Sequence, residues 1–378
     1  MSELRICQVQ NKKDLHEMAT FPWVVYRGDK NWVPPILKER EAQLDPDQNR
    51  FFQIADVARY IARRDDRTVG TIAAFIDHRF NEYFQQRVGF FGFFEVLNDY
   101  EAAEALLSTA RDWVRARGMT ELRGPINFHR DRERGILVSG ADCPPPMLCA
   151  HSPSYYREFV ERFGMVKHDD SLARRLFASD FLDKDGNIPL RLRRLAEAAE
   201  RRTRFSIRQA NLANWEHEVA LVGQLYDATI GLMPDHIPWE QEELKEFAEE
   251  LRPIIDPAFA LFGEVDGRTV GMAIAFPDFN QVLIHLNGRL DGLNKLKAWW
   301  YLRRVKVLSF KIAGVLEEYQ GRGLEALLLL RIAERAVRRG YEWVDLSLNA
   351  EENDRVATLA AHFGAEEYKR YRVYKMPL

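Results

Sequence analysis

The sequence is poor in cysteine, has no large surplus of charge and contains no long hydrophobic run. Its three cysteines, Cys7, Cys143 and Cys149, share no metal-ligand spacing with a nearby histidine, so we interpret them as reduced cytosolic thiols. A formal net charge of −3 excludes a generally basic nucleic-acid-binding protein, because phosphate binding requires an excess of Lys and Arg. No run of about 18 apolar residues occurs, which excludes a membrane-spanning helix. The beginning, MSELRICQVQNKKD, lacks the apolar core of a signal peptide, and a cytoplasmic location is expected.

A repeated segment divides the chain of 378 residues into two similar halves. The stretch Arg67–Phe75 recurs as Arg268–Phe276, and each copy follows an acidic turn and an apolar run. This pattern is typical of a β-hairpin, with Asp266-Gly267 as the stronger turn signal. Phe163-Gly164-Met165 is matched by Phe363-Gly364-Ala365 at a similar offset. Two matches in the same order predict duplicated domains.

The segment 180–203 separates the two halves. It begins with turn residues, Asp185-Gly186-Asn187 and Pro189, and continues into a basic amphipathic helix over 190–202. The sequence therefore predicts a first domain at 1–179, a linker with a connecting helix at 180–203, and a second domain at 204–378.

The second half shows the clearest order of elements. The pattern predicts, in order, a strand at 205–209, helices at 215–232 and 239–251, strands at 259–265, 269–276 and 305–315, a helix at 323–339, a strand at 343–348, a helix at 353–363 and a closing pair of strands within 366–374. This is an α+β arrangement, with a mixed, mostly antiparallel sheet flanked by helices. The first half follows a similar order, with a helix at 101–117 that ends at Gly118.

A loop with two glycines, Gln320-Gly321-Arg322-Gly323, joins the strand at 305–315 to the next helix. Glycine lets the backbone approach a phosphate without a Cβ clash, and the first amides of a helix lie unpaired at the positive end of its dipole. A diphosphate can therefore bind here, and Arg322 can add a charge-assisted contact. Two glycines also occur in ordinary strand-to-helix turns, so the loop alone leaves both interpretations open.

The arrangement resembles the GCN5-related N-acetyltransferase (GNAT) superfamily, whose loop reads Gln or Arg, two residues, Gly, one residue, then Gly or Ala. Gln320 and Gly323 match this signature, but Glu325 stands at its last position and places a carboxylate near the expected diphosphate. The resemblance implies an acyl-CoA co-substrate and no metal. The residues expected to hold the CoA are Val315, Gln320, Gly321, Arg322, Gly323, Leu324 and Asn353.

A later helix of this superfamily starts near an Asn and carries, four residues before a Gly, a Tyr that protonates the departing thiolate. Asn353 and Gly364 keep this spacing, but Ala360 replaces the tyrosine. Another group or water must then supply the proton, or this half binds CoA without fast chemistry.

A closer resemblance covers nearly the whole chain. It is similar to a tandem bacterial GNAT family of uncharacterised acetyltransferase-like proteins, and to bacterial ceramide synthases that N-acylate a sphingoid base. The segments that carry this resemblance are Phe21–Tyr26, Trp32–Pro35, Gly89–Glu95, Gly124–Phe128, Ser154–Tyr156 and Tyr368–Tyr374.

The first half lacks the glycine loop. Leu97–Ala102 stands in its place, and its residues Asp99 and Glu101 would repel a diphosphate. We therefore expect this domain either to shape the pocket for the acyl acceptor or to act as a scaffold. The candidate pocket residues are Phe93, Asn127, Tyr155 and Tyr156, although paired aromatic residues also form ordinary cores.

Two residues are candidates for the general base. Glu95 ends an aromatic strand, where this fold commonly places a base, and burial among phenylalanines would raise its pKa towards neutrality. A position at the wet edge of the strand is the competing interpretation. His285, beside Asn287-Gly288, is the second candidate, and a structural role is its alternative.

The sequence thus predicts an N-acyltransferase in which an amine attacks the thioester of an acyl-CoA directly, with a backbone amide of 309–315 holding the oxyanion. The acyl length stays open, because Phe90–Phe94, Phe21–Trp23 and Trp299–Tyr301 could line an apolar tunnel or form an ordinary core. If the acceptor is a sphingoid base, Trp299-Trp300 could enter the membrane interface. The alternatives are a non-catalytic CoA-binding or scaffold protein and an aminoacyl transferase of the tandem GNAT type.

Overall fold

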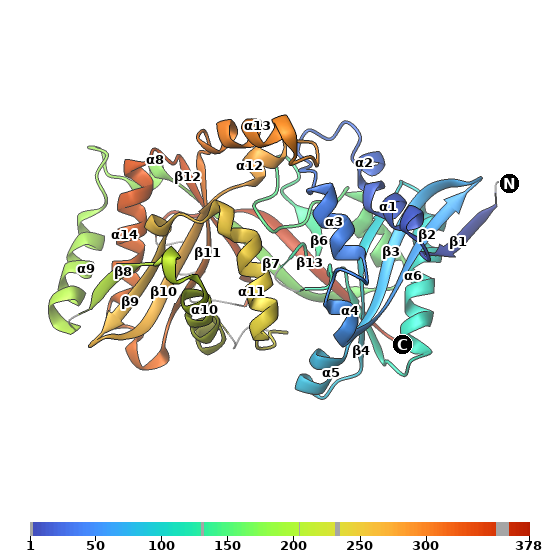
Figure 1. Cartoon of the computed structure of the whole chain (residues 1–378), viewed down its shortest axis with the longest axis horizontal. Coiled ribbons are helices and arrows are strands. Elements are labelled where there is room, and N and C mark those ends of the chain that lie inside the picture. The colour runs from blue at the N-terminus through green and yellow to red at the C-terminus, as the bar shows by residue number, and fades with distance from the viewer. Residues whose placement is uncertain (1–2, 130–131, 204, 231–234, 353–362) are drawn as a thin grey trace. The chain divides into compact units, whose positions relative to one another are not determined.

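The computed structural model describes residues 3–129, 132–203, 205–230, 235–352 and 363–378 (Figure 1). The chain divides into two compact units, neither of which is continuous in sequence. The first unit consists of Met1–Leu172, Val282–Trp300 and Lys369–Leu378, and the second of Ala173–Gln281 and Tyr301–Tyr368. The predicted domains are continuous in sequence, whereas in the structure Val282–Trp300 and Lys369–Leu378, both from the predicted second domain, belong to the first unit.

The first unit is a mixed, mostly antiparallel sheet. Its strands are β1 (Leu4–Gln8), β2 (Ala55–Arg64), β3 (Arg67–Asp77), β4 (Val88–Val96), β5 (Glu121–Gly124), β6 (Ile136–Ser139), the first part of β7 (Val166–Phe177) and the last part of β13 (Glu366–Pro377). The strands β1 to β4 pair in order as antiparallel neighbours, and β4 then pairs with β5 in parallel. Strand β13 pairs antiparallel with both β5 and β6.

Helices surround this sheet. They are α1 (Lys12–Thr20), α2 (Pro22–Val25), α3 (Leu37–Leu44), α4 (Phe51–Ile54), α5 (His78–Phe84), α6 (Tyr100–Arg115), α7 (Tyr155–Arg162) and most of α13 (Gly292–Leu302), while α12 (Asn280–Leu283) crosses the unit boundary. The predicted helix at 101–117 is α6, and the chain turns away from it at Gly118, whose φ is +82°.

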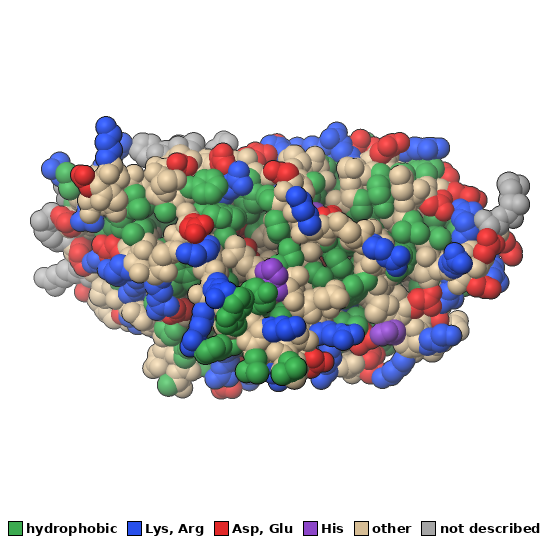
Figure 2. Space-filling view, turned by 90° about the horizontal axis from the view of Figure 1, so that it is seen from above, with side chains coloured by type: hydrophobic (Ala, Val, Ile, Leu, Met, Phe, Trp, Pro, Cys, Tyr) green, Lys and Arg blue, Asp and Glu red, His purple; other side chains and the backbone are tan. Residues whose placement is uncertain are grey.

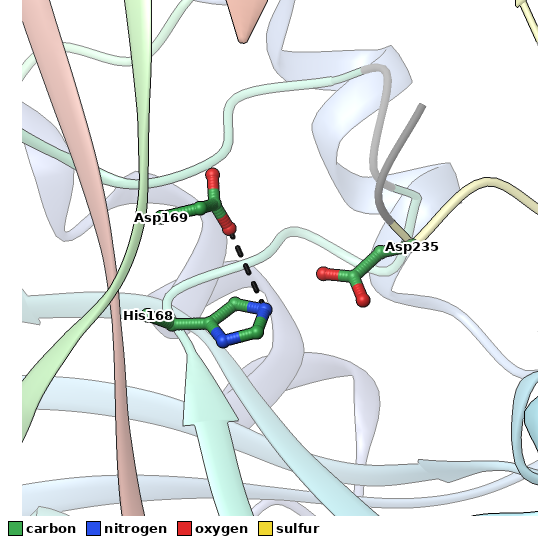
Figure 3. Close-up of side chains that lie close together, drawn as sticks. All are labelled: His168, Asp169 and Asp235. Carbon is green, nitrogen blue, oxygen red and sulfur yellow. Dashed lines mark ion pairs between the residues drawn. The ribbon is translucent and has the colours of Figure 1, made fainter. Parts of the chain in front are cut away.

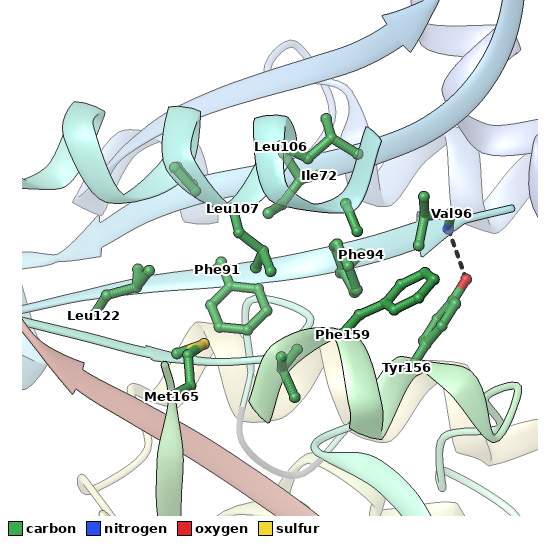
Figure 4. Close-up of a cluster of buried hydrophobic side chains, with 14 of the residues drawn as sticks. Ile72, Phe91, Phe94, Val96, Leu106, Leu107, Leu122, Tyr156, Phe159 and Met165 are labelled. Atoms are coloured by element: carbon green, nitrogen blue, oxygen red, sulfur yellow. Dashed lines mark hydrogen bonds between the residues drawn. The ribbon is translucent and has the colours of Figure 1, made fainter. Parts of the chain in front are cut away.

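Helix α6 supplies much of the first unit's core because its apolar residues recur at helical spacing. Ala103, Leu106, Leu107 and Ala110 are fully buried against β2, β3 and β4 (Figure 4). Burying each leucine stabilises the fold by about 2 kcal/mol. Asp99 caps the helix by accepting a hydrogen bond from the amide of Ala102 at 3.2 Å.

The second unit repeats this plan. Its strands are the last part of β7, then β8 (Ser206–Gln209), β9 (Ala260–Val265), β10 (Arg268–Pro277), β11 (Val307–Val315), β12 (Trp343–Ala350) and the first residues of β13. Its helices are α8 (Ala178–Phe181), α9 (Leu190–Thr203), α10 (Trp215–Ile230), α11 (Gln241–Leu251) and α14 (Leu324–Arg338), with short 3₁₀ turns at Leu212–Asn214, Arg252–Ile254, Pro257–Phe259 and Glu317–Tyr319. Strands β8 to β11 are antiparallel neighbours, and β11 pairs with β12 in parallel.

The sequence repeat falls on equivalent strands. Its two copies are β3 and β10, each the second strand of a hairpin. Gly70 of β3 lies opposite Val96, and Gly271 of β10 lies opposite Val315. A Cβ at Gly70 would come within 2.6 Å of Leu106 on α6, whereas at Gly271 it would lie 3.1 Å from a carbon of Leu324 on α14. Both glycines thus allow the helix that follows the next strand to pack closely on the sheet, and the predicted α+β fold with two similar halves is confirmed.

Two parts of the prediction differ from the structure. The expected pair of closing strands within 366–374 is wrong, because Glu366–Pro377 forms one strand. From Lys369 onward that strand belongs to the first unit, where Asp170 accepts hydrogen bonds from Arg370 and Arg372. The helix α13 was not predicted, because its exposed apolar residues do not follow the pattern of a core-facing helix. Among the described residues, no helix combines the length and apolar character needed to cross a bilayer.

Candidate active site

The glycine loop of the second unit leads from β11 into α14. Gln320 anchors its start by donating a side-chain hydrogen bond to the carbonyl of Val315 at 2.9 Å. Gly321 and Gly323 have φ values of +70° and +94°, which other residues rarely adopt. Gly323 is the N-cap of α14, and no described side chain caps the helix at this point. The backbone amides of the first turn are therefore available to an anion.

Glu325, whose position in the sequence places a carboxylate near the expected diphosphate, contacts this loop directly. Its Oε1 accepts a hydrogen bond from the amide of Gly321 at 3.3 Å. The carboxylate therefore competes for one of the amides that a diphosphate would use. Arg322, in contrast, stacks over the ring of Tyr319 with its guanidinium carbon 5.4 Å from the ring centre.

The equivalent helix start in the first unit is occupied by side chains. Asp99 caps α6, and Arg64 forms ion pairs with Asp99 at 2.9 Å and with Glu101 at 2.7 Å. A negative charge already fills the position that a diphosphate would take. That this loop does not bind CoA stays a prediction.

Glu95, near the end of β4, is surrounded by tyrosines. The hydroxyl of Tyr156 donates to Glu95 Oε2 at 2.8 Å and accepts from the amide of Val96 at 2.7 Å. Tyr26 is a further neighbour of the carboxylate, but its hydroxyl donates to the carbonyl of His151 at 2.8 Å, and the Tyr155 hydroxyl donates to the carbonyl of Val96. Burial raises the pKa of Glu95 to about 7, although the neighbouring Tyr156 and Tyr26 lower it. The residue keeps partial exposure to solvent, so a carboxylate with a nearly neutral pKa stays reachable.

A second, partly exposed carboxylate lies next to this group. Glu133 forms an ion pair with Arg40 at 2.6 Å and accepts a hydrogen bond from the Asn127 side chain at 2.7 Å. Burial raises the pKa of Glu133, but the charge and hydrogen bonds of Arg40 outweigh it and the pKa is lowered. The Asn127 side-chain oxygen in turn accepts from the amide of Phe93, whose φ is +47°. The two carboxylates therefore differ: Glu133 is held as an anion, whereas Glu95 can exchange a proton near neutral pH.

The predicted pocket residues Phe93, Asn127, Tyr155 and Tyr156 thus all lie in the first unit near Glu95 or Glu133. The sequence reasoning missed Tyr26, Arg40 and Glu133 as members of this group. They come from three separate segments, and no local spacing connects them. Tyr26 stood within a motif of the family resemblance, which was the only signal available.

Comparison with known proteins shows which family has a chain of this kind, with a glycine loop in one unit and a cluster of tyrosines around Glu95 in the other. No family model matches the chain. The bacterial ceramide synthase of Caulobacter vibrioides (strain NA1000 / CB15N) is 30% identical over 390 residues, which cover 100% of this chain and 98% of that protein. Protein YghO of Escherichia coli (strain K12) is 26% identical over 371 residues, 97% of this chain and 93% of YghO. A solved tandem GNAT protein from the clavulanic acid biosynthesis pathway covers 99% of this chain and 98% of its own, with a TM-score of 0.57 at 15% identity.

The chain belongs to the family of the bacterial ceramide synthase, and it has the fold of tandem GNAT proteins. The resemblance found in the sequence is thereby confirmed, and with it a family of acyltransferases. In this GNAT protein the two units have diverged at equivalent positions. Thr71 lies opposite Glu95 in the first unit, and Met272 lies opposite Gly314 in the second. A side chain at Gly314 would clash with Thr229 of α10, so the second unit has a covering helix where the first has its carboxylate.

The second unit of the GNAT protein has a polar cluster of its own, which the sequence did not indicate. Asp345 of β12 is fully buried and accepts hydrogen bonds from Ser309 at 2.6 Å, Ser347 at 2.7 Å and Tyr368 at 2.9 Å. Lys311 forms an ion pair with it at 3.2 Å. Lys311 is skipped in the register between β10 and β11, which forms a bulge here. Four donors satisfy Asp345, so it holds the strands together rather than serving as a base.

The remaining predicted residues lie elsewhere. His285 is exposed in the segment after α12, outside the group around Glu95. Its neighbour Asn287 accepts a hydrogen bond from the indole of Trp23 at 2.8 Å, which fixes this segment within the first unit. Trp299 and Trp300 are exposed, so they do not line an enclosed tunnel. Asn353 and Ala360 lie outside the described residues.

His168 and Asp169 are neighbours on β7 with a side-chain separation of 3.6 Å (Figure 3). Asp235, also drawn there, belongs to the second unit, and we assign no metal site. That the reaction needs no metal stays a prediction.

Proposed function

We propose that the protein is an acyl-CoA-dependent N-acyltransferase that transfers an acyl group to an amine. The observation that carries this proposal is the contrast between the two helix starts. Gly323 leaves the first turn of α14 without a side-chain cap, whereas Asp99 fills the matching position of α6. One unit therefore offers the site for a diphosphate that acyl-CoA requires. Val315, Gln320, Gly321, Arg322, Leu324 and Asn353 are the other residues proposed to hold it.

In the proposed reaction the amine nitrogen attacks the thioester carbonyl carbon, the C–S bond breaks and an amide forms. Glu95 accepts the proton that the nitrogen loses, and the CoA thiolate takes up one proton from water, because the side chain of Ala360 offers none. The hydroxide that remains removes the proton from Glu95 and so restores the base. A base with a pKa of about 7 suits this step at neutral pH. Glu95 is favoured over His285 because it is desolvated and held by hydrogen bonds, whereas His285 is exposed. A backbone amide of β11 serves as the oxyanion donor.

The acceptor in this proposal is a sphingoid or another lipid amine, and the acyl group is long. The support is the name of the Caulobacter relative, a bacterial ceramide synthase. The proposal places the enzyme in the cytoplasm, with peripheral contact at the inner membrane. The pocket for the amine would include Phe93, Asn127, Tyr155 and Tyr156.

The test combines native mass spectrometry with a thiol-release assay. We expect co-purified CoA species, and thiol release from palmitoyl-CoA in the presence of sphinganine but not from acetyl-CoA. Release from acetyl-CoA alone would overturn the long-chain acyl group and keep the N-acyltransferase. CoA binding without release by any amine would favour the non-catalytic alternative, to which Ala360 points. Transfer from an aminoacyl-tRNA without CoA binding would favour the other alternative, an aminoacyl transferase of the tandem GNAT type.

Glu325→Gln is expected to tighten CoA binding about threefold to tenfold at low salt. The change keeps the shape of the side chain but removes a negative charge within a few ångströms of the proposed diphosphate, and such a pair costs about 1 kcal/mol in water. Isothermal titration with CoA measures the effect. Glu334→Gln, farther along the same helix, is the control and should leave the affinity unchanged. A weaker affinity for Glu325→Gln would show that the carboxylate supports the loop rather than competing with the ligand.

Two neighbours of Glu95 are expected to move the pH dependence of turnover in opposite directions. Tyr156→Phe removes a hydrogen bond that lowers the pKa of Glu95, so the rise in activity should shift to higher pH. Glu133→Gln removes a charge that raises this pKa and frees Arg40 to lower it, so the rise should shift to lower pH. The pH profile of kcat/KM reports both shifts. Shifts in the same direction would contradict the assignment of Glu95 as the titrating group.

A further inference from the structure

Helix α13 exposes a row of large hydrophobic side chains. Leu293, Leu296, Trp299 and Trp300 are 77%, 67%, 54% and 44% exposed. They make up four of the eight large hydrophobic side chains that are exposed in the described part of the chain. Single exposed apolar residues are common on proteins, but a row of this kind marks an interaction surface.

The helix is held in place from its other side. Leu293, Leu296 and Trp300 follow a spacing of three and then four residues, which places them on one face. Ala298, which points another way, is buried. The segment just before α13 is fixed in the first unit by Trp23. The indole of Trp23 donates a hydrogen bond to Asn287, and its ring packs so closely on Gly288 that a Cβ there would lie within 2.4 Å of it. The apolar face is therefore presented by an anchored helix.

The charge around this face is positive. Lys295 and Lys297 are exposed within α13, Arg289 and Asp291 are exposed just before it, and α13 itself contains no Asp or Glu, so the positive charges are in excess. Figure 2, which looks onto the side that carries α13, shows hydrophobic side chains bordered by Lys and Arg. Tryptophan favours the boundary between lipid and water, and lysines beside it favour anionic headgroups.

We propose that α13 docks the protein onto the surface of an anionic lipid bilayer. Its 11 residues are too few to span the hydrocarbon core, which takes about 20 residues, so the helix would lie in the plane of the interface. Leu293, Leu296, Trp299 and Trp300 enter the boundary region, and Lys295 and Lys297 contact the headgroups. This docking proposal specifies the peripheral membrane contact that is part of the proposed function. The docking proposal itself rests only on the surface of α13, so it does not depend on which reaction the protein catalyses.

Flotation of the full chain with vesicles tests the proposal. We expect binding to vesicles of phosphatidylglycerol and phosphatidylcholine, and at least about tenfold weaker binding to phosphatidylcholine alone. The double variant Trp299→Ser/Trp300→Ser should lose at least about tenfold in affinity for the anionic vesicles. Lys295→Glu/Lys297→Glu should lose the preference for anionic lipid. Tyr83→Ser, which removes an aromatic residue 56% exposed on α5, and Lys12→Glu/Lys13→Glu on α1 are the matched controls and should bind as the unaltered chain does.

Circular dichroism and CoA titration keep the outcome interpretable, because none of these variants touches the loop at Gly323. A folded, CoA-binding variant that no longer floats supports membrane docking whether or not the acyltransferase assignment holds. Absence of vesicle binding by the unaltered chain overturns the proposal, and so does equal loss in the control variants. If light scattering shows instead that the unaltered chain is a dimer and that Trp299→Ser/Trp300→Ser makes it monomeric without any vesicle binding, a second copy of the chain covers this face.

Discussion

Gly323→Asp is expected to abolish CoA binding, with a loss of at least about 100-fold in affinity. Gly323 is the N-cap of α14 and has a φ of +94°. The new side chain would stand where the diphosphate approaches, and its oxygen would accept a hydrogen bond from the first turn as Asp99 does on α6. The variant thus converts the open helix start of the second unit into the closed one of the first. Isothermal titration with CoA measures the change.

The matched control is Gly340→Asp. Gly340 follows the other end of the same helix, has a φ of +72° and has open space around its missing side chain, as Gly186 and Gly164 do. The cost of a non-glycine residue at positive φ is therefore similar in both variants, and thermal melting should register it in both. Only Gly323→Asp should lose CoA. Undiminished CoA binding by Gly323→Asp would place the ligand elsewhere and remove the main support for the proposed function.

The parts of the fold that the sequence predicted are those with local causes. The hairpins at Asp66 and Gly267, the helix α6 and the glycine loop each depend on residues within one or two turns of each other. The family resemblance then linked these parts into two tandem units. The catalytic candidate Glu95 was predicted because it ends an aromatic strand, where the fold of the family that the chain resembles commonly places a general base.

The parts that escaped prediction depend on contacts between distant residues. Arg40 meets Glu133 across 93 positions, and neither lies in a motif. Strand β13 leaves the second unit and completes the first because Asp170 binds Arg370 and Arg372, a pairing across about 200 positions that no periodicity shows. Helix α13 was missed because its exposed apolar face does not match the pattern of a helix that packs on a core.

The two units differ at equivalent positions although they share a plan. Each has the hairpin, the glycine opposite the end of the strand that follows the hairpin, and the helix after that strand. The first unit keeps a carboxylate at Glu95 and closes its helix start with Asp99, whereas the second keeps the open start at Gly323 and has Gly314 in place of the carboxylate.

Glu95→Gln is expected to lower kcat about 10²-fold to 10⁴-fold, the contribution typical of a general base. Affinity for CoA should stay unchanged, because the loop of the second unit is untouched. The carboxylate is the active form and its pKa is raised to about 7, so the activity of the unaltered enzyme should rise with pH up to about 7 and then level off. In Glu95→Gln this rise should disappear. Glu104→Gln, an exposed carboxylate on α6, and His285→Gln are the controls and should keep it.

Thermal melting of Glu95→Gln distinguishes a variant that has lost only its general base from one that has lost its fold. In the unfolded chain the Glu95 carboxyl ionises near its ordinary pKa of 4.5, whereas in the folded protein it ionises only near 7. Ionisation therefore favours the unfolded chain, and the folded state loses stability between these two pH values. Glutamine has the same shape, can accept the hydrogen bond from Tyr156 and does not ionise. Glu95→Gln should accordingly melt no lower than the unaltered protein at pH 8 while being almost inactive. A folded variant that stays active with the same pH profile would exclude Glu95 as the base.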